Sequence, residues 1–371
     1  METVYQWKYL DYVWDNPEQK EEAINSGNYN VSECYLNDID KADDGRIFVT
    51  VPKFFNDTVP ASLVTVSDTI GSGGPLLCPY PDWSWYNNNN TCDNIVNVYS
   101  IYIKCNHIFV LDTGLGISEN CDPKLLIFNL ENNTLVKTIN IPPDIATNES
   151  GSGFLTRPFV YFYVIQHKYK YTQVFISDMI GSGLVIYDSS KNSSCRVESD
   201  FMRATNSINF TIANETISFI ADLFYNPLTE KKIYKMKIAN LLKCPDRETA
   251  NNQTELAGEL SVQTGPIASA KCSIFTTNYL QSTIEGTNAC KQFYPESMVV
   301  LAQNNETLQS VSGMKALKNH KELIVLSNRF DAFIFGINPN ETNFFVVKFD
   351  LKKIQKEINS NTCTKYDLHN V

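Results

Sequence analysis

The sequence predicts an all-β protein, either a sandwich or a propeller. Its hydrophobic segments are short and rich in β-branched and aromatic residues, a pattern that is typical of strands. Turn residues such as Asp112-Thr113-Gly114 separate these segments, as expected where the chain reverses direction. Helical periodicity is clear only at residues 351–358 and is weak at residues 18–24. The expected strands are residues 47–51, 61–66, 98–103, 107–111, 124–130, 159–165, 173–177, 184–187, 217–223, 232–238, 298–302, 322–327 and 343–349.

A loose sequence pattern recurs along the chain: an apolar strand, an Asp or Asn, a turn, and another apolar strand. It occurs at residues 109–114, 175–188, 219–234 and 324–328, with spacing too irregular for a consensus repeat. A four-stranded blade takes roughly 40 to 60 residues, so six blades would use the whole chain. No Pro/Gly/Ser-rich linker divides it. We therefore expect one domain, residues 1–371, folded as a six-bladed β-propeller with a C-terminal tail.

Charge and hydropathy exclude two classes of partner. The chain carries 31 basic and 41 acidic residues, for a formal net charge of −10. A surface this acidic repels phosphate backbones, so we expect no nucleic-acid partner. No apolar run approaches the roughly 18 residues that a membrane-spanning helix needs, so we expect no membrane span. The start of the chain lacks the basic and apolar regions of a signal peptide, and we expect a mature chain with an added initiator Met.

Cysteines and glycosylation sequons indicate an oxidising compartment. No two cysteines form a C-x-x-C pair, and an even, scattered set suits disulfides. The ten cysteines are Cys34, Cys78, Cys92, Cys105, Cys121, Cys195, Cys244, Cys272, Cys290 and Cys363. The eleven sequon asparagines are Asn30, Asn56, Asn89, Asn132, Asn148, Asn192, Asn209, Asn214, Asn252, Asn305 and Asn340. An asparagine-rich chain forms some sequons by chance, but the two patterns together predict a secreted, extracellular glycoprotein.

Recognisable motifs for metals, cofactors and nucleophilic catalysis are absent from the sequence. The four histidines are far apart and show no metal-ligand spacing. Residues 38–45 resemble a calcium loop, but Ala42 and Val49 occupy two ligand positions, so we interpret the run as a solvated turn. The three Gly-Ser-Gly stretches fit neither a nucleophile elbow nor a phosphate-binding loop. We therefore expect no metal, no cofactor and no catalytic residue.

Three stretches carry more specific information. Residues 73–84 read Gly-Gly-Pro-Leu-Leu-Cys-Pro-Tyr-Pro-Asp-Trp-Ser, residues 105–114 read Cys-Asn-His-Ile-Phe-Val-Leu-Asp-Thr-Gly, and residues 121–128 read Cys-Asp-Pro-Lys-Leu-Leu-Ile-Phe. With residues 7–14, 23–29, 47–53, 59–63, 183–187, 306–309 and 324–328, they resemble the major royal jelly protein and yellow family, especially its royal jelly branch. The resemblance spans nearly the whole chain and is weakest between about 190 and 290. It implies a secreted six-bladed β-propeller.

The resemblance also implies disulfide pairings. The implied pairs are Cys92–Cys121 and Cys290–Cys363. Cys105 matches a family cysteine whose usual partner is missing here, because residues 166–169 read Gln-His-Lys-Tyr, so Cys105 needs another partner such as Cys195. The remaining cysteines suggest Cys34–Cys78 and Cys244–Cys272, although sequence does not fix connectivity.

A ligand site is the second implication of the resemblance. The sand-fly salivary members of the family bind biogenic amines, partly through an S-N-x-F motif after an apolar strand, and this chain has Ser327-Asn328-Arg329-Phe330 there. Asn328 could accept a hydrogen bond from an amine or hydroxyl, and Phe330 could stack on an aromatic ring or meet a cation. The alternative is that Asn328 caps a strand and Phe330 packs under a loop.

Two neighbouring positions bear on this site. A threonine of the amine binders' pocket falls near Ser312-Gly313 in this chain, so one polar contact is expected to be missing. Arg329 would repel a cationic amine if its side chain pointed inward.

These observations lead to three functional hypotheses. The first is a non-catalytic secreted protein that binds or sequesters a small ligand, either a biogenic amine or a sterol-like molecule, or serves as a nutritive protein. The second is a tautomerase of the dopachrome-converting type found among yellow relatives, which needs a base with a pKa near the working pH. The third is a structural subunit of an oligomer.

Overall fold

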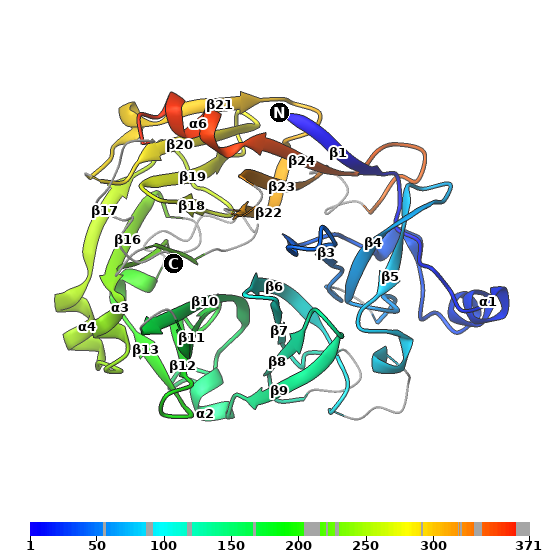
Figure 1. The fold of residues 1–371 in the computed structure, drawn as a ribbon, viewed down its shortest axis with the longest axis horizontal. Helices are drawn as coiled ribbons and strands as arrows, with labels where there is room; N and C mark the ends of the chain where they lie inside the picture. Colours follow the sequence, from blue (N-terminus) through cyan, green and yellow to red (C-terminus); the bar gives the residue numbers. More distant parts are fainter. Residues whose placement is uncertain are drawn as a thin grey trace. The chain divides into compact units, whose positions relative to one another are not determined.

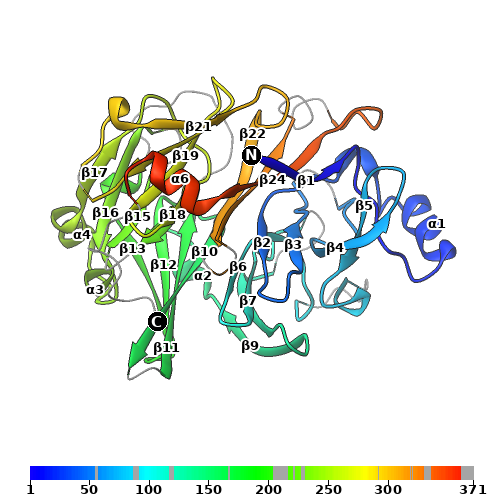
Figure 2. The same ribbon diagram turned by 45° about the horizontal axis from the view of Figure 1, so that its top comes forward.

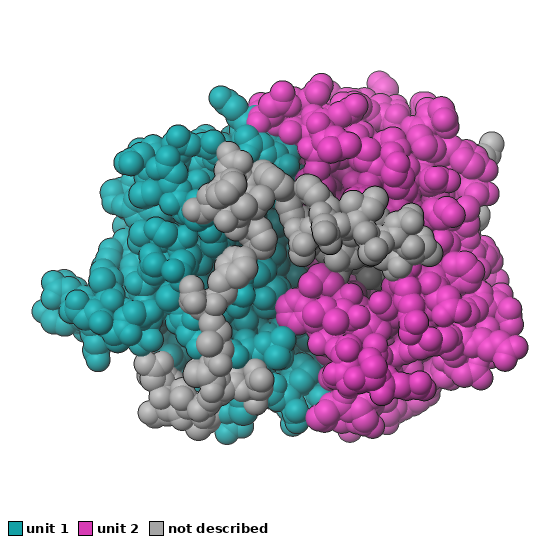
Figure 3. Space-filling view, turned by 180° about the vertical axis from the view of Figure 1, so that it is seen from behind, with its two compact units in different colours: residues 1–141, 306–320, 324–348 teal, residues 142–305, 321–323, 349–371 magenta. Residues whose placement is uncertain are grey.

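The computed structural model describes residues 1–54, 57–86, 92–116, 121–165, 168–203, 216–219, 222–226, 230–290, 292–317, 319, 321–329 and 336–360. Its strands form six four-stranded antiparallel sheets, so the predicted six-bladed β-propeller is confirmed (Figure 1). The chain divides into two compact units (Figure 3), and each is described by itself. No helix in the described ranges combines the length and apolar character needed to cross a membrane.

The first unit comprises residues 1–141, 306–320 and 324–348. One blade contains β2 (Ile39–Lys41), β3 (Ile47–Thr50), β4 (Leu63–Ile70) and β5 (Pro75–Pro79). The next contains β6 (Val98–Lys104), β7 (His107–Asp112), β8 (Lys124–Asn129) and β9 (Thr134–Asn140). A third contains β22 (Ser310–Leu317), β23 (Glu322–Asn328), β24 (Phe344–Asp350) and β1 (Glu2–Trp7). This unit also holds α1 (Pro17–Asn25), η1 (Val31–Glu33) and η2 (Trp83–Tyr86).

The second unit comprises residues 142–305, 321–323 and 349–371. Its first blade contains β10 (Leu155–Ile165), β11 (Lys168–Asp178), β12 (Gly183–Asp188) and β13 (Ser193–Glu198). The second contains β14 (Thr216–Phe219), β15 (Asp222–Tyr225), β16 (Lys232–Lys237) and β17 (Glu255–Glu259). The third contains β18 (Ala268–Ala270), β19 (Ser273–Asn278), β20 (Thr283–Asn288) and β21 (Val299–Gln303). The helical segments are α2 (Pro143–Ala146), η3 (Asp200–Met202), α3 (Ile238–Leu241), α4 (Arg247–Gln253), η4 (Pro295–Ser297) and α6 (Leu351–Glu357). The hairpin of β10 and β11 extends beyond the pairing of β11 with β12, which starts at Gln173 (Figure 2).

The two helices that periodicity indicated are present, and each begins at a capping side chain. Asn16 Oδ1 accepts the N–H of Gln19 at the start of α1, and Asp350 Oδ1 accepts the N–H of Lys353 at the start of α6. The expected strand at residues 217–223 is wrong. Two strands replace it, because β14 ends at Phe219, β15 begins at Asp222, and these two residues pair in the antiparallel register.

Burial on both faces of the inner strands shows that this blade packs against its neighbours. In β7 and β8 nearly every residue is buried, and Val110, Leu126 and Phe128 join a core cluster with Phe48 and Leu63 from the neighbouring blade. Strand β9 is the outer strand of its sheet and is exposed at all but one position. Burial therefore decreases from the inner to the outer strands of this blade.

The hairpin between β6 and β7 turns on two residues with left-handed backbone. Cys105 and Asn106 have φ of 50° and 56°, and Lys104 pairs with His107 across them. Consecutive positive φ angles define the tight turn that matches the twist of a two-residue hairpin. This geometry places Cys105 at the tip of the hairpin.

Candidate functional site

Asn328, the last residue of β23, has its side chain fixed by two hydrogen bonds. Its Nδ2 donates to the carbonyl oxygen of Leu36 at 2.9 Å and to Ser312 Oγ at 3.1 Å. Ser312 lies on β22, and Leu36 lies in the segment before β2. Because a carbonyl oxygen can only accept, the Leu36 contact sets which amide atom is the nitrogen and therefore fixes the orientation of Oδ1.

Oδ1 of Asn328 is buried and has no hydrogen-bond partner in the structure, and the same holds for Oγ of the fully buried Ser327 within the described ranges. Leaving such an atom unpartnered costs about 1–3 kcal/mol, and folded proteins keep few of them. A fixed, unused acceptor is the group that a ligand with an N–H or O–H donor would bind. This is the strongest chemical feature of the predicted site.

The other residues of the predicted site give separate results. Ser312 Oγ accepts a hydrogen bond from Asn328 Nδ2, and the expected loss of a polar contact to a ligand at this position stays a prediction. The Arg329 guanidinium forms an ion pair with Glu341 Oε2, which compensates its positive charge. Phe330 lies outside the described residues, and its stacking role stays a prediction.

Asp112 ends β7, so it occupies the place in its blade that Asn328 occupies at the end of β23. Its carboxylate has four partners, and none of its capacity remains unused. Oδ2 lies 3.2 Å from the buried Lys124 Nζ. The backbone N–H donors, at 2.9–3.0 Å, belong to Val96, Asn97 and Gly114.

Asp178 ends β11 and is also compensated on both oxygens, although its buried Oδ2 accepts no hydrogen bond from the described residues and is balanced by an ion pair instead. Oδ1 accepts the N–H groups of Phe154 and Gly181, and Oδ2 lies 2.7 Å from the Arg196 guanidinium. In these two blades the recurring Asp at the end of an apolar strand is therefore a structural clamp, by which we mean a buried carboxylate that holds backbone N–H groups and one cationic side chain in place. Asn328 keeps the position but leaves an oxygen unpartnered.

Asp38 and Asp40 correct the interpretation of residues 38–45 as a solvated turn. Both are buried, with exposures of 0% and 3%. Asp38 directly precedes β2 and Asp40 lies in it, and both accept backbone N–H groups from β6. Asp38 Oδ2 accepts from Ile101 at 3.1 Å and Asp40 Oδ2 from Ile103 at 2.7 Å. Only the later part of the run, with a positive φ at Gly45, forms the expected turn.

Burial raises the pKa of Asp40 to about 7, an effect opposed by the positive charge of Lys315 on β22. Lys315 Nζ lies 3.3 Å from Asp38 Oδ2 and 5.6 Å from the centre of the Tyr102 ring. A carboxyl group that titrates near neutrality can donate or accept a proton there. The sequence did not indicate this buried carboxyl group because acidic runs usually lie in solvent, and only the i, i+2 spacing of Asp38 and Asp40 is typical of a shared strand face.

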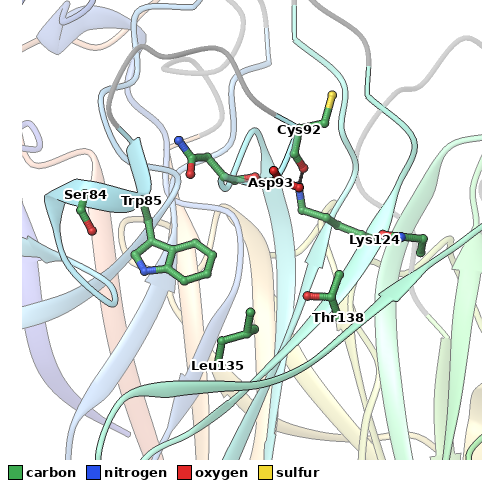
Figure 4. A pocket seen from close by; sticks show the side chains of 9 residues that line it. Ser84, Trp85, Cys92, Asp93, Lys124, Leu135 and Thr138 are labelled. Carbon is green, nitrogen blue, oxygen red and sulfur yellow. Dashed lines mark hydrogen bonds between the residues drawn. The ribbon is translucent and has the colours of Figure 1, made fainter.

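A pocket of about 670 Å³ opens beside β9 (Figure 4). In Figure 4, Trp85 and Leu135 line one side and Thr138 another, with Asp93 and Lys124 above them. Lys124 Nζ donates to the carbonyl oxygens of Cys92 and Asn94 in addition to its ion pair with Asp112. The remaining lining residues are Ser84, Cys92, Asn94 and Asn140.

The disulfides agree with the resemblance at one pair and differ at others. Cys92 and Cys121 form a disulfide with a Cα–Cα distance of 5.6 Å. The implied pair Cys290–Cys363 stays a prediction, because Cys363 lies outside the described residues. Cys195, on β13, bonds Cys244 after α3.

The suggested pairs Cys105–Cys195, Cys244–Cys272 and Cys34–Cys78 are therefore wrong. The bond between Cys195 and Cys244 rules out the first two pairs, because it takes Cys195 from one and Cys244 from the other. Cys272 is itself disulfide-bonded, to a different cysteine. Cys34 has a free thiol that is fully buried, and its Sγ donates to the carbonyl oxygen of Asn30 at 3.4 Å. Cys78 and Cys105 are also free thiols.

The predicted sequons divide into described and undescribed ones. Those outside the described residues are Asn56, Asn89, Asn209 and Asn214. Exposed ones are Asn132, Asn192, Asn252, Asn305 and Asn340, whereas Asn30 and Asn148 are half-buried. Asn132 Oδ1 accepts from the N–H and hydroxyl of Thr134, so the first and third sequon residues contact each other directly.

No group of three metal-ligating side chains occurs in the part of the chain that the structure describes. Of the histidines, only His107 is described, and its Nδ1 hydrogen-bonds the carbonyl oxygen of Cys105. His167, His320 and His369 lie outside the described residues. The described residues therefore contain no assembled metal centre.

Comparison with known proteins places the chain in a family. The family model described as major royal jelly protein matches residues 96–359. Major royal jelly protein 8 of Apis mellifera is 32% identical over 94% of this chain and 89% of its own length. Major royal jelly proteins 9 and 3 of the same species are 30% and 32% identical, covering 94% and 100% of this chain and 88% and 72% of their own lengths. The chain belongs to the major royal jelly protein family.

Proposed function

We propose that this protein binds a small aromatic ligand with an N–H or O–H donor, such as a biogenic amine, at Asn328 and Ser312. The observation that carries the proposal is the buried, unpartnered Oδ1 of Asn328. The amide orientation is fixed before binding, so a ligand donor meets a preorganised acceptor and needs no rearrangement of the side chain. The role is binding or sequestration without chemical change of the ligand.

Aromatic side chains beside Leu36 support an aromatic ligand. Tyr35 contacts Phe54 with ring centres 6.5 Å apart, and Phe54 contacts Tyr99 at 5.1 Å, both edge to face. Aromatic rings in such a cluster offer edges and faces to another ring, and pairs of this kind contribute about 0.5–1.5 kcal/mol beyond the area that they bury. An aromatic amine combines the ring and the donor that this region can bind.

Titration calorimetry of the secreted, glycosylated protein tests the proposal. The ligands are serotonin, dopamine, octopamine, histamine and a sterol. We expect saturable micromolar binding of an amine, and an Asn328→Ala variant that binds about tenfold or more weakly because a buried hydrogen bond is lost. A matched control is Asn278→Ala at the end of β19, where Oδ1 already accepts from Gln281. Loss of affinity in both variants, or none in Asn328→Ala, contradicts the site.

Phe330 provides a second test of the same site. If its ring stacks on the ligand, Phe330→Ala weakens amine binding by about 1–3 kcal/mol without lowering stability. Unchanged affinity with a lower unfolding free energy would instead assign the ring to the core. Calorimetry and urea unfolding of the one variant separate these outcomes.

Tautomerisation of a dopachrome-like substrate is the second candidate, and Asp40 favours it. A carboxyl with a pKa near 7 matches the base that removal of a carbon-bound proton requires. The absorbance of dopachrome followed with wild type and Asp40→Asn tests this function. Turnover that disappears in the variant, with amine binding retained, would support the enzyme; no turnover by wild type would dismiss it.

We also propose that the chain is a secreted N-glycoprotein. Five described sequons have exposed asparagines, and disulfides such as Cys92–Cys121 form where the environment is oxidising. Mass spectrometry of protein secreted from eukaryotic cells, before and after enzymatic removal of N-glycans, tests this. Recovery only from the cytosolic fraction, with no glycan mass, would contradict it.

A further inference from the structure

The pocket beside β9 is a second, independent candidate for ligand binding. Its volume of about 670 Å³ lies within the range of small-molecule sites. Its wall residue Cys92 is held by the bond to Cys121, and the carbonyl oxygens of Cys92 and Asn94 are held by Lys124. One wall of the pocket is therefore a loop whose backbone is held in place, and another is β9, the edge strand of its sheet.

The charges in the pocket disfavour an anionic ligand. Among the described residues that line it, Lys124 is the only basic one, and its ammonium group is already shared by Asp112 and two carbonyl oxygens. A donor group that is fully engaged offers no hydrogen bond to a phosphate or carboxylate. The exposed Asp93 adds one negative charge, which is screened by solvent. A neutral ligand fits this balance best.

The walls combine an aromatic surface with several neutral hydrogen-bonding groups. The half-buried Trp85 indole packs edge to face on Phe128, with ring centres 5.1 Å apart, and so has a fixed orientation. Leu135 extends the apolar surface, and Thr138 presents a hydroxyl (Figure 4). Asn140, which is exposed on β9, adds an amide to the lining. A pyranose has the matching pattern, since its C–H groups form an apolar face and its hydroxyls both donate and accept.

We propose that this pocket binds a neutral pyranose sugar, with the apolar face of the ring on Trp85 and the hydroxyl groups on Asp93, Thr138 and Asn140. Two sources can supply that chemistry. One is a free saccharide in the surrounding fluid. The other is an N-glycan of the chain itself, because the sequon at Asn89, which lies outside the described residues, falls between Trp85 and Cys92 in the sequence.

The test uses saturation-transfer NMR and calorimetry with N-acetylglucosamine, methyl α-mannopyranoside and methyl α-glucopyranoside. The proteins are the secreted wild type and an Asn89→Gln variant, each confirmed as folded by its melting temperature. We expect at least one sugar to bind Asn89→Gln at about 1 mM or tighter. Binding by both proteins indicates a free saccharide, whereas binding by Asn89→Gln alone indicates that the chain's own glycan fills the wild-type pocket.

Variants of the pocket wall are made in the Asn89→Gln background. Thr138→Val removes one hydroxyl at nearly constant shape, and we expect roughly threefold to tenfold weaker binding. Trp85→Ala should weaken it about tenfold or more. Val136→Ala, on the same strand and exposed but outside the pocket, is the control and should bind normally. The proposal is overturned if folded Asn89→Gln binds none of the three sugars. It is also overturned if all the wall variants bind sugar as tightly as Asn89→Gln itself.

Discussion

Asp112 and Asn328 end the second strands of two blades in the same unit, yet their surroundings differ. The Asp112 carboxylate accepts three backbone N–H groups and pairs with Lys124. The Asn328 amide uses its nitrogen to bind Leu36 and Ser312, and its buried oxygen has no partner among the residues that the structure describes. A position that recurs through the fold thus has a structural role in one blade and an unused binding group in another.

This difference shows how a repeated architecture can acquire a ligand site. A fully satisfied clamp contributes to stability and offers nothing to a ligand, because each lone pair is occupied. An acceptor left unpartnered lowers stability somewhat and is retained where a function uses it. The two residues should therefore respond in opposite ways when stability and ligand binding are measured on matched variants.

The largest effect is expected for Asp112→Ala. Removing the carboxylate leaves Lys124 buried with an uncompensated charge and three backbone N–H groups without their acceptor, so the unfolding free energy should fall by about 3–5 kcal/mol. Urea unfolding monitored by fluorescence measures the loss. Asp112→Asn, which keeps the shape, should lose less. Equal stability of the alanine variant and wild type would show that Asp112 is no clamp.

Removing the disulfide beside this clamp should have the next largest effect. Cys92 and Cys121 are 29 residues apart, and the carbonyl oxygen of Gly114, two residues after Asp112, accepts the N–H of Cys121 at 2.8 Å. The double variant Cys92→Ser/Cys121→Ser should lose about 2–4 kcal/mol of unfolding free energy. Because the same bond braces the pocket of Figure 4, sugar binding should weaken in parallel. A change confined to one of the two readouts would show that loop and pocket are not coupled.

Asp40 should make stability depend on pH. Its pKa is raised from 3.8 to about 7, so the native state holds the proton more tightly than the unfolded chain does. The unfolding free energy attributable to Asp40 therefore falls as pH rises from about 4 to about 7, with a slope of at most about 1.4 kcal/mol per pH unit, and then levels off. Subtracting the pH profile of Asp40→Asn from that of wild type isolates this slope. Parallel profiles would place the pKa of Asp40 near its ordinary value.

The smallest stability effect is expected for Asn328→Ala. The variant loses two hydrogen bonds of Nδ2 but also removes the unpartnered Oδ1, and these contributions offset each other, leaving a change below about 1 kcal/mol. Urea unfolding under the conditions used for Asp112→Ala gives the direct contrast. A loss as large as that of Asp112→Ala would mean that Asn328 is a second clamp.

The sequence predicted well what depends on local patterns. Strands such as β7 and β8 are continuous apolar runs between turn residues, so their positions follow from the residues themselves. The threonine-rich β19 and β20 were missed because their polar side chains are buried among hydrogen-bond partners, as at Thr283 and Glu285. Propensity and hydrophobicity carry no information on such partners.

The candidate site shows the same limit more sharply. The motif at residues 327–330 identified Asn328, but its partner Leu36 is 292 residues away and contributes a backbone carbonyl, which any residue type could supply. Asp40 was misread because its burial results from pairing with the backbone of β6. Contacts of this kind arise from topology, and no local pattern of residues reports them.

The pairing of β1 with β24 has a consequence for biosynthesis. Trp7 pairs with Phe344, so the strand made first completes a sheet whose other strands are made last. At the usual pace of translation, about 5–20 residues per second, on the order of half a minute passes before the partner strand leaves the ribosome. During that time the backbone of residues 2–7 has no sheet to join. Chaperones that shield nascent chains would therefore protect residues 2–7 until residues 344–348 are available to pair with them.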